Sequence, residues 1–313
     1  MKALVTGAAG FIGSTLSERL LADGSDVVGI DCFTDYYPRP IKERNLSALV
    51  GHPRFRFVES TIRDANLKTL LSDRTHVFHL AAQAGVRKSW GRDFAIYTVN
   101  NIEATQLLLE AVSGLSTIER LVYASSSSVY GDNVAIPMRE DALPQPVSPY
   151  GVTKLAAEQL CYLYHTNYSV PAVSLRYFTV YGPRQRPDMG FHKFLRATIR
   201  AEPIRLYGDG EQTRDFTYVH DAVNATVAAA VRGVPGRVYN IGGGSRVTVN
   251  RVVELIGRVA GRQPLVEADA AQPGDMRHTY ADTSLARTDL GFQPQVGLEE
   301  GLKAEYQWLA GVL

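Results

Sequence analysis

A tyrosine and a lysine four residues apart, Tyr150 and Lys154, have the types and spacing that suit proton transfer. The spacing puts both side chains on one face of a helix that we predict over 148–168. Ser148 and Pro149 suit the N-cap and first-turn positions, so the pair lies near the helix start. A free tyrosine has a pKa of about 10, and a base that works near pH 7 needs that pKa lowered by roughly 3. The Lys154 ammonium favours the phenolate in this way.

Four consecutive serines, Ser125 to Ser128, follow a predicted strand over 120–124. In a doubly wound sheet, ligands bind in the crevice outside the carboxyl ends of the strands. These hydroxyl groups are therefore predicted to line a ligand crevice, and a polar turn is the alternative interpretation.

A glycine-rich run, Gly7-Ala-Ala-Gly-Phe-Ile-Gly13, lies between a short apolar run and a pattern typical of a helix. Glycines at such a turn let the backbone approach a pyrophosphate, and the helix N-terminus supplies N–H groups and positive charge to the anion. Asp31, at the end of the second predicted strand, suits an adenosine ribose and disfavours a 2′-phosphate. The pattern thus predicts an NAD site rather than an NADP site. The alternative is a tight turn beside a solvated aspartate.

Strands and helices alternate through the first half of the chain, which predicts a parallel sheet covered on both faces. The predicted strands are 3–6, 26–31, 55–58, 76–80, 120–124 and 172–177, and the predicted helices are 11–21, 94–113, 148–168, 190–201, 220–231, 248–260 and 298–311. We predict an α/β fold, a Rossmann-type doubly wound parallel sheet with a smaller α/β substrate-binding lobe. Residues 1–180 are predicted to form the NAD-binding domain, with segments near 215–245 returning to it, and residues 181–313 are predicted to form the smaller substrate-binding lobe.

The composition is that of an ordinary globular protein: 313 residues, 45% hydrophobic and 21% charged, with a net charge of +1. Near-neutral charge gives no sign of nucleic-acid binding, and no apolar run is long enough for a membrane span. The first residues do not resemble a signal peptide. Cys32 and Cys161 are interpreted as free thiols in a reducing cytoplasm, and no cluster has metal-ligand spacing.

Taken together, these motifs resemble the extended short-chain dehydrogenase/reductase superfamily over essentially the whole chain. The motifs that carry the resemblance are TGAAGFIG, Asp31, His79-Leu-Ala-Ala-Gln83, Asn100, SSSSVYG, Tyr150 with Lys154, Leu175-Arg-Tyr-Phe178, Tyr181-Gly-Pro183, Tyr207-Gly-Asp-Gly210, Arg214-Asp-Phe216, Val219-His-Asp221, Asn240-Ile-Gly242 and Gln272-Pro-Gly-Asp275. The later motifs resemble the nucleotide-sugar branch, which keeps NAD bound and recycles it. His220-Asp221 is interpreted as a strand-to-helix junction rather than a catalytic pair.

The resemblance implies a role for each matching residue. The catalytic group is Ser126, Tyr150 and Lys154. The NAD contacts are Gly7, Gly10, Phe11, Ile12, Asp31, Ala81, Gln83, Asn100, Tyr150, Lys154 and Tyr177. The substrate contacts are Arg87, Ser127, Ser128, Thr179, Arg186, Tyr207, Gln212, Arg214 and Asp275. Solvated loop arginines are the alternative for Arg87 and Arg186. Thr61 departs from the family pattern, because many relatives have an aspartate there that contacts adenine.

Variable positions point to one reaction within this branch. Ser127 and Ser128 stand where 4,6-dehydratases carry an Asp-Glu pair, and serine cannot supply that acid and base. Thr179, the Gln272 motif, and Asp35-Tyr-Tyr37 with Lys42 resemble UDP-glucuronic acid 4-epimerases. The resemblance therefore implies NAD-dependent conversion of UDP-glucuronic acid to UDP-galacturonic acid through a 4-keto intermediate. Open alternatives are a 4-epimerase of UDP-glucose or UDP-N-acetylglucosamine, a UDP-glucuronate decarboxylase, and a non-enzymatic NAD sensor.

Relatives in this branch usually dimerise by pairing two helices per subunit, which implies a homodimer through helices 94–113 and 149–168. A role in polysaccharide or moenomycin-type glycolipid assembly is compatible with the resemblance. No motif in the chain indicates which pathway it serves.

Overall fold

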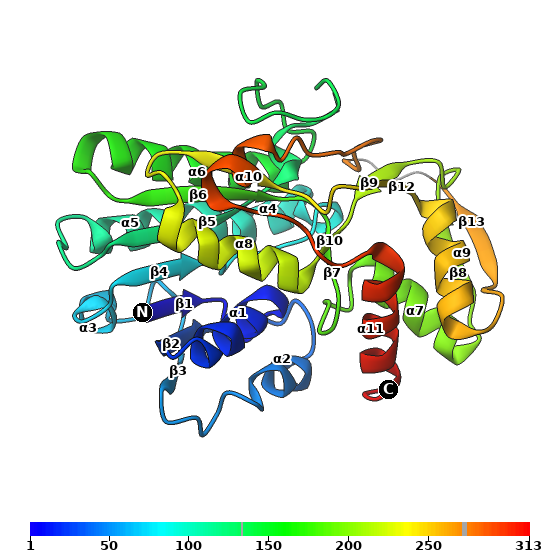
Figure 1. The fold of residues 1–313 in the computed structure, drawn as a ribbon, viewed down its shortest axis with the longest axis horizontal. Helices are drawn as coiled ribbons and strands as arrows, with labels where there is room; N and C mark the ends of the chain where they lie inside the picture. Colours follow the sequence, from blue (N-terminus) through cyan, green and yellow to red (C-terminus); the bar gives the residue numbers. More distant parts are fainter. Residues whose placement is uncertain (133, 271–273) are drawn as a thin grey trace.

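The computed structural model describes residues 1–132, 134–270 and 274–313. Its centre is a seven-stranded sheet in the order β11-β6-β5-β4-β1-β2-β3, and every neighbouring pair is parallel (Figure 1). The strands are β1 Lys2–Thr6, β2 Asp26–Asp31, β3 Phe55–Glu59, β4 His76–His79, β5 Arg120–Ser126, β6 Ala172–Tyr177 and β11 Val238–Ile241. The predicted Rossmann-type sheet is confirmed, and its strand order reverses between β1 and β4.

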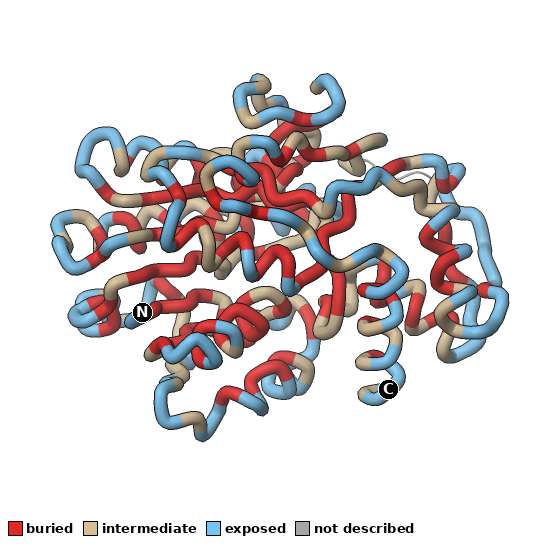
Figure 2. The backbone as a smooth tube through the Cα atoms, viewed as in Figure 1, coloured by how far each residue is buried: buried red, intermediate tan, exposed pale blue. Residues whose placement is uncertain are grey.

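Apolar side chains on both faces of the strands bury the sheet from two sides, which explains the near-continuous apolar runs in the sequence. Ala3 and Val5 of β1 belong to one core cluster, and Leu4 between them belongs to the other. Helices α1 Phe11–Ala22 and α8 Val219–Arg232 cover one face, whereas α3 Leu67–Leu71, α5 Ala104–Val112 and α6 Pro149–Tyr168 cover the other. Figure 2 shows the buried strands between these layers.

The prediction of one continuous α-helix over 94–113 is wrong in the middle of that range. A short helix α4, Phe94–Tyr97, leads into a π-helical segment, Thr98–Glu103, before α5 begins. The cause is the buried Asn101 side chain, whose Oδ1 accepts from the Gln83 amide at 2.7 Å and whose Nδ2 donates to the Gln83 carbonyl and to Thr153 Oγ1. Single π-helical turns of this kind are frequent at functional sites.

Three small two-stranded sheets and three helices lie beyond the carboxyl ends of the central strands, at the right of Figure 1. The pairs are β7 Val180–Tyr181 with β10 Thr217–Tyr218, β9 Thr213–Asp215 with β12 Arg246–Thr248, and β8 Ile204–Tyr207 with β13 Val266–Asp269. The helices are α7 Gly190–Arg200, α9 Val249–Ala260 and α11 Leu298–Ala310. The division into two lobes near residue 180 stays a prediction, although α8 and β11 lie with the central sheet.

The predicted helices after residue 180 agree with α7, α8, α9 and α11 to within one residue at each end. Three short helices were not predicted: α2 Arg39–Leu46, α3 and α10 Ser284–Leu290. His220 and Asp221 lie at the junction of β10 and α8, as expected, and the Asp221 carboxylate accepts from the amides of Gln295 and Val296. No helix in the described ranges is long and apolar enough to cross a bilayer.

Candidate active site

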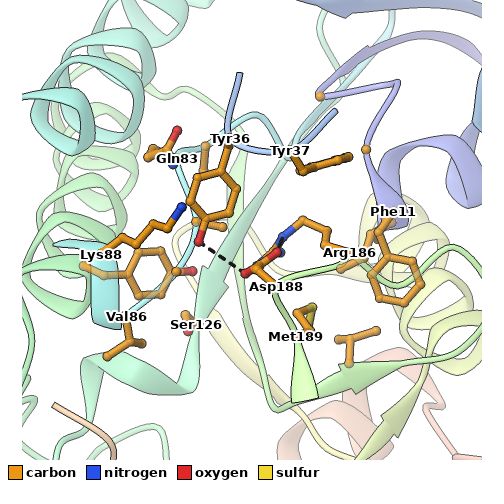
Figure 3. Close-up of a pocket in the computed structure, with 18 of the residues that line it drawn as sticks. Phe11, Tyr36, Tyr37, Gln83, Val86, Lys88, Ser126, Arg186, Asp188 and Met189 are labelled. Carbon is orange, nitrogen blue, oxygen red and sulfur yellow. Dashed lines mark hydrogen bonds and ion pairs between the residues drawn. The ribbon is translucent and has the colours of Figure 1, made fainter. Parts of the chain in front are cut away.

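A cavity of about 1390 Å³ lies at the carboxyl ends of the central strands, where the strand order reverses (Figure 3). It exceeds the volume of a usual single-ligand pocket, so it has room for a dinucleotide beside a second ligand. A smaller cavity of about 160 Å³ adjoins it and shares Ser127, Ser128, Thr179 and Asp275 in its wall.

The large cavity brings together nearly all of the site residues predicted from the sequence. They are Gly7, Gly10, Phe11, Ile12, Asp31, Ala81, Gln83, Arg87, Asn100, Ser126, Ser127, Ser128, Tyr150, Lys154, Tyr177, Thr179, Arg186, Tyr207 and Asp275. Arg214 lines only the smaller cavity, and Gln212 lines neither. The Gln212 side chain instead donates to the Tyr207 carbonyl at 2.9 Å, so it supports the backbone behind Tyr207. Gln272 and Pro273 lie outside the described residues.

The glycine-rich turn between β1 and α1 has the close backbone packing that a pyrophosphate site needs. A Cβ atom on Gly13 would overlap the carbonyl oxygen of Gly7, so only glycine fits there. Asp31 lies beside this turn, because its carboxylate accepts from the amides of Ala9 at 3.1 Å and Phe33 at 2.9 Å. The turn, the helix N-terminus and this oriented carboxylate fit a dinucleotide with an unsubstituted ribose.

Beyond Asp31 the cavity wall is formed by the turn after β3. Thr61 Oγ1 donates to the Asp64 carboxylate at 2.6 Å and accepts from the Asp64 amide at 3.1 Å, and both residues line the cavity. The Asp64 carboxylate thus lies beside Thr61, at the position where the family resemblance led us to expect an aspartate.

The start of α6 is packed directly against the serine turn after β5. Ser148 caps the helix by accepting from the Gly151 amide at 3.1 Å, as predicted. A Cβ atom on Gly151 would overlap the Ser128 carbonyl oxygen, so the first turn of α6 touches the serine turn. Ser126 lies in extended backbone at the end of β5, and its Oγ accepts from the Ser128 amide at 3.1 Å. This packing brings Tyr150 beside Ser126.

Burial and neighbouring charges act in opposite directions on the two titratable groups of α6. Burial raises the pKa of Tyr150, whereas the Arg186 guanidinium and a hydrogen bond with Ser126 lower it. From the sequence we expected Lys154 to lower the pKa of Tyr150. In the structure the cation that lowers this pKa is Arg186. Burial lowers the pKa of Lys154 to about 7, against the effects of Cys161 and Glu158. The Lys154 Nζ atom lies 4.5 Å from the centre of the Tyr123 ring.

Arg186 is fixed in the cavity wall by partners that the sequence did not reveal (Figure 3). Its Nε and Nη2 atoms each lie 3.0 Å from an oxygen of Asp188. The Tyr36 hydroxyl donates to the same carboxylate at 3.2 Å. The Arg186 side chain is only 22% exposed, so the solvated-loop alternative is wrong for this residue.

Replacing Arg186 tests its electrostatic effect on Tyr150. In Arg186→Gln the pKa of Tyr150 rises, because burial is then opposed only by the Ser126 hydrogen bond. The sequence analysis predicts that Tyr150 acts as a base, and a base loses activity as the pH falls through its pKa; on that prediction the acidic limb of the pH–rate profile moves upward by roughly one pH unit. Arg184→Gln is the matched control, because Arg184 pairs with Glu18 of α1 and does not line the cavity. An acidic limb at the same pH in Arg186→Gln and Arg184→Gln would contradict the assignment of Arg186 as the cation that lowers the Tyr150 pKa.

The far end of the large cavity carries a further set of cationic and aromatic side chains. Arg87 Nη2 lies 2.7 Å from an Asp275 oxygen, and its guanidinium lies 4.2 Å from the centre of the Tyr207 ring. Arg214, in the wall of the adjoining smaller cavity, donates to the carbonyls of Thr213 and Arg277. The sequence analysis missed Arg196 of α7, which lines the cavity and whose buried Nε has no hydrogen-bond partner. The sequence predicted that Arg196 lies on a helix, but it did not predict that its side chain faces the cavity.

The geometry agrees with comparisons with known proteins. Residues 3–242 match the NAD dependent epimerase/dehydratase family. The chain belongs to this family. It is 44% identical to a Bacillus subtilis protein described as an uncharacterized UDP-glucose epimerase, over 100% of this chain and 99% of the relative. It is 38% identical to a UDP-glucuronate 4-epimerase of Thermodesulfobacterium geofontis, over 97% and 95% of the two chains.

The same family includes a solved structure with a very similar fold. This is the Bacillus cereus UDP-glucuronic acid 4-epimerase in complex with UDP-glucuronic acid and NAD. It is 45% identical to this chain, with a TM-score of 0.97 and full coverage of both chains. The similarity therefore extends over the whole chain and not only over residues 3–242.

Proposed function

We propose that this protein is an NAD-dependent 4-epimerase that converts UDP-glucuronic acid to UDP-galacturonic acid. The observation that carries the proposal is one cavity in which Ser126, Tyr150 and Lys154 share a wall with the hydroxyl groups of Ser127, Ser128 and Thr179. The likeness to the Thermodesulfobacterium and Bacillus cereus epimerases supports it.

The residues of the large cavity fit NAD. Gly7, Gly10, Phe11 and Ile12 would hold the pyrophosphate, and Asp31 the adenosine ribose. The ammonium of Lys154 has three donors, which suit the hydroxyls of the second ribose. Further contacts would come from Ala81, Gln83, Asn100 and Tyr177. The chemistry that bound NAD supplies is reversible hydride transfer at C4 of the sugar.

Tyr150 is the proposed base: it takes the proton of the C4 hydroxyl and returns it to the same oxygen after the 4-keto intermediate has turned, so that C4 is reduced on its opposite face. Ser126 assists by a hydrogen bond to the same oxygen. Arg186 stabilises the phenolate, since it is the cation that lowers the pKa of Tyr150. The net redox change is zero, so the cavity need not release the cofactor between turnovers.

The three hydroxyl groups have a second proposed task, which is to bind the sugar carboxylate. A 4-keto uronate is a β-keto acid, and it loses CO₂ when the carboxylate bond aligns with the carbonyl π-system. Ser127, Ser128 and Thr179 can hold an anion by hydrogen bonds without a fixed countercharge. Holding the carboxylate out of that alignment is a matter of orientation, and it separates epimerisation from decarboxylation.

This role predicts a change of product in a hydroxyl-deficient variant. The double variant Ser127→Ala/Thr179→Val removes two of the three donors, so the carboxylate gains rotational freedom. We expect the enzyme to release CO₂ and form a UDP-pentose. The ratio of this decarboxylation to epimerisation should rise at least about tenfold. The products are measured by chromatography with NMR detection. The control is Ser60→Ala, a serine that lines the same cavity beyond Asp31. An unchanged product ratio in the double variant would argue against carboxylate steering.

The diphosphate and uridine would occupy the far end of the cavity, beside Arg87, Tyr207, Arg214 and Asp275. We propose that Arg87 exchanges its ion pair with Asp275 for a contact with the diphosphate, because an arginine can bind phosphate by two parallel hydrogen bonds.

A 4-epimerase of UDP-glucose is the second candidate, because the Bacillus subtilis relative carries that description. The test is a substrate panel of UDP-glucuronic acid, UDP-glucose and UDP-N-acetylglucosamine at equal concentration. The proposal predicts the largest kcat/KM for the uronate. A larger value for a neutral sugar would transfer the assignment to the second candidate, and stoichiometric CO₂ release would make the protein a decarboxylase.

We also propose a homodimer formed through α4, α5 and α6. Ile96 of α4 and Val152 and Leu163 of α6 are 47–50% exposed, and a second subunit would cover these apolar side chains. A molar mass of a single 34.4 kDa chain by light scattering would contradict the dimer.

A further inference from the structure

A buried ion pair joins three elements behind the proposed active site. Arg176 of β6 binds the Glu158 carboxylate of α6 through two hydrogen bonds, Nη2–Oε1 at 2.6 Å and Nε–Oε2 at 3.0 Å. Their side chains are 3% and 1% exposed. Ser125 of β5 donates to Glu158 Oε2 at 2.6 Å. The Glu158 carboxylate is therefore held from two strands and cannot change its orientation alone.

Each member of this cluster lies next to a residue of the proposed site. Ser125 precedes Ser126, and Arg176 precedes Tyr177, and the two pairs are in register between β5 and β6. Glu158 follows Lys154 by one helical turn, so the two side chains occupy the same face of α6. A buried ion pair is weak evidence for a purely stabilising role, because apolar residues of the same volume often stabilise as well. Its position indicates a second role.

Among the described groups around Lys154, Glu158 supplies the negative charge. Lys154 has no carboxylate within 4.0 Å among the residues that the structure describes. From β4, burial lowers the pKa of His79 to about 3, so its ring is neutral. From β5, burial raises the pKa of Tyr123 well above its usual range. On α6 itself, burial raises the pKa of Cys161 to about 12, so the thiol is also neutral.

Two further charged groups near this wall act on Tyr150. They are Arg186 and Asp188, which bind one another and act on Tyr150. From β6, Arg176 adds positive charge, but it is bound to Glu158. The π-helical segment that packs on α6 presents Asn101, which has no titratable group. Around Lys154 the negative charge therefore comes from Glu158.

We propose that Glu158 is a positioning residue that acts through Lys154: held by Arg176 and Ser125, its carboxylate keeps the buried lysine in the ammonium form that the reaction needs. The proposal rests on the proposed epimerase function, since that function gives the ammonium its task. The supporting electrostatics agree, because Cys161 and Glu158 both oppose the lowering of the Lys154 pKa by burial, and of the two only Glu158 is charged near neutral pH, since burial raises the pKa of the Cys161 thiol to about 12.

The test is the variant Glu158→Gln, which keeps an acceptor for Arg176 and Ser125 but removes the charge. Without the carboxylate the pKa of Lys154 falls further, so the ammonium loses its proton at lower pH. We expect the alkaline limb of the kcat–pH profile to move downward by roughly one pH unit. The control is Arg176→Lys, which keeps both charges but loses the two-point contact; it should lower thermal stability and leave the limb in place.

A second readout separates this proposal from the epimerase assignment. The chain has only seven lysines, so ¹³C-ε-lysine NMR can follow the titration of Lys154 directly, with Lys154→Arg for the resonance assignment. A lower Lys154 pKa in Glu158→Gln supports the countercharge even if the wild type converts no UDP-sugar, an outcome that would overturn only the proposed function. If Glu158→Gln does not fold, Glu158→Gln/Arg176→Met replaces it, with a smaller downward shift expected. An unchanged pKa, or an equal shift in Arg176→Lys, would show that the cluster is merely structural.

Discussion

Tyr150→Phe should abolish turnover, by a factor of at least roughly 10³, while NAD stays bound. The substitution removes only the phenolic oxygen, which the proposed mechanism uses to take and return the C4 proton. The ring keeps its edge contact with Tyr97, whose ring centre lies 6.3 Å away, so the cavity wall is preserved. The measurements are the initial rate with UDP-glucuronic acid and the NAD content of the purified variant.

Tyr37→Phe is the matched control, because Tyr37 lines the same cavity and has no assigned part in proton transfer. It should retain most of the wild-type rate. Turnover by Tyr150→Phe within tenfold of wild type would show that another group is the base, and loss of NAD would show that the hydroxyl serves the cofactor instead.

Gly13→Ala should eliminate NAD binding and with it all activity. The added methyl group would overlap the Gly7 carbonyl oxygen, so the turn between β1 and α1 must shift. That shift moves the N–H groups at the start of α1 away from the pyrophosphate position. We expect the NAD affinity to fall at least about a hundredfold, measured by calorimetry on protein freed of cofactor.

The control for this variant is Gly297→Ala at the start of α11. A Cβ atom there meets nothing within 4 Å, and the residue does not line the cavity. Gly297→Ala should bind NAD as the wild type does, with a small loss of stability at the helix cap. Normal NAD binding by folded Gly13→Ala would contradict the cofactor site proposed for the glycine turn.

The sequence predicted the features that depend on neighbouring residues. Tyr150 and Lys154 share a helix face because of their spacing, and Ser148 caps that helix as its residue type indicates. Six of the seven central strands were predicted because residues buried on both faces are apolar on both faces, whereas β11 was not predicted. The cavity could then be placed at the strand ends by the rule for open α/β sheets.

Features set by contacts between distant segments could not be predicted. The π-helical turn depends on the hydrogen bonds of Asn101 with Gln83 and Thr153. The fixed position of Arg186 depends on Asp188 and on Tyr36, which is 152 residues from Asp188 in the chain. Gln212 matched the family pattern for a substrate contact, yet its side chain turns to the Tyr207 backbone. A residue pattern gives the identity of a side chain but not its partners.

Hydride transfer at C4 within the enzyme can be followed with UDP-glucuronic acid deuterated at C4. The purified enzyme is incubated with this substrate without added NAD, and the products are followed by NMR. The account predicts UDP-galacturonic acid that retains deuterium at C4, with no release of CO₂. Formation of a UDP-pentose, loss of the deuterium to solvent, or recovery of unchanged UDP-glucuronic acid by enzyme that contains NAD would contradict it.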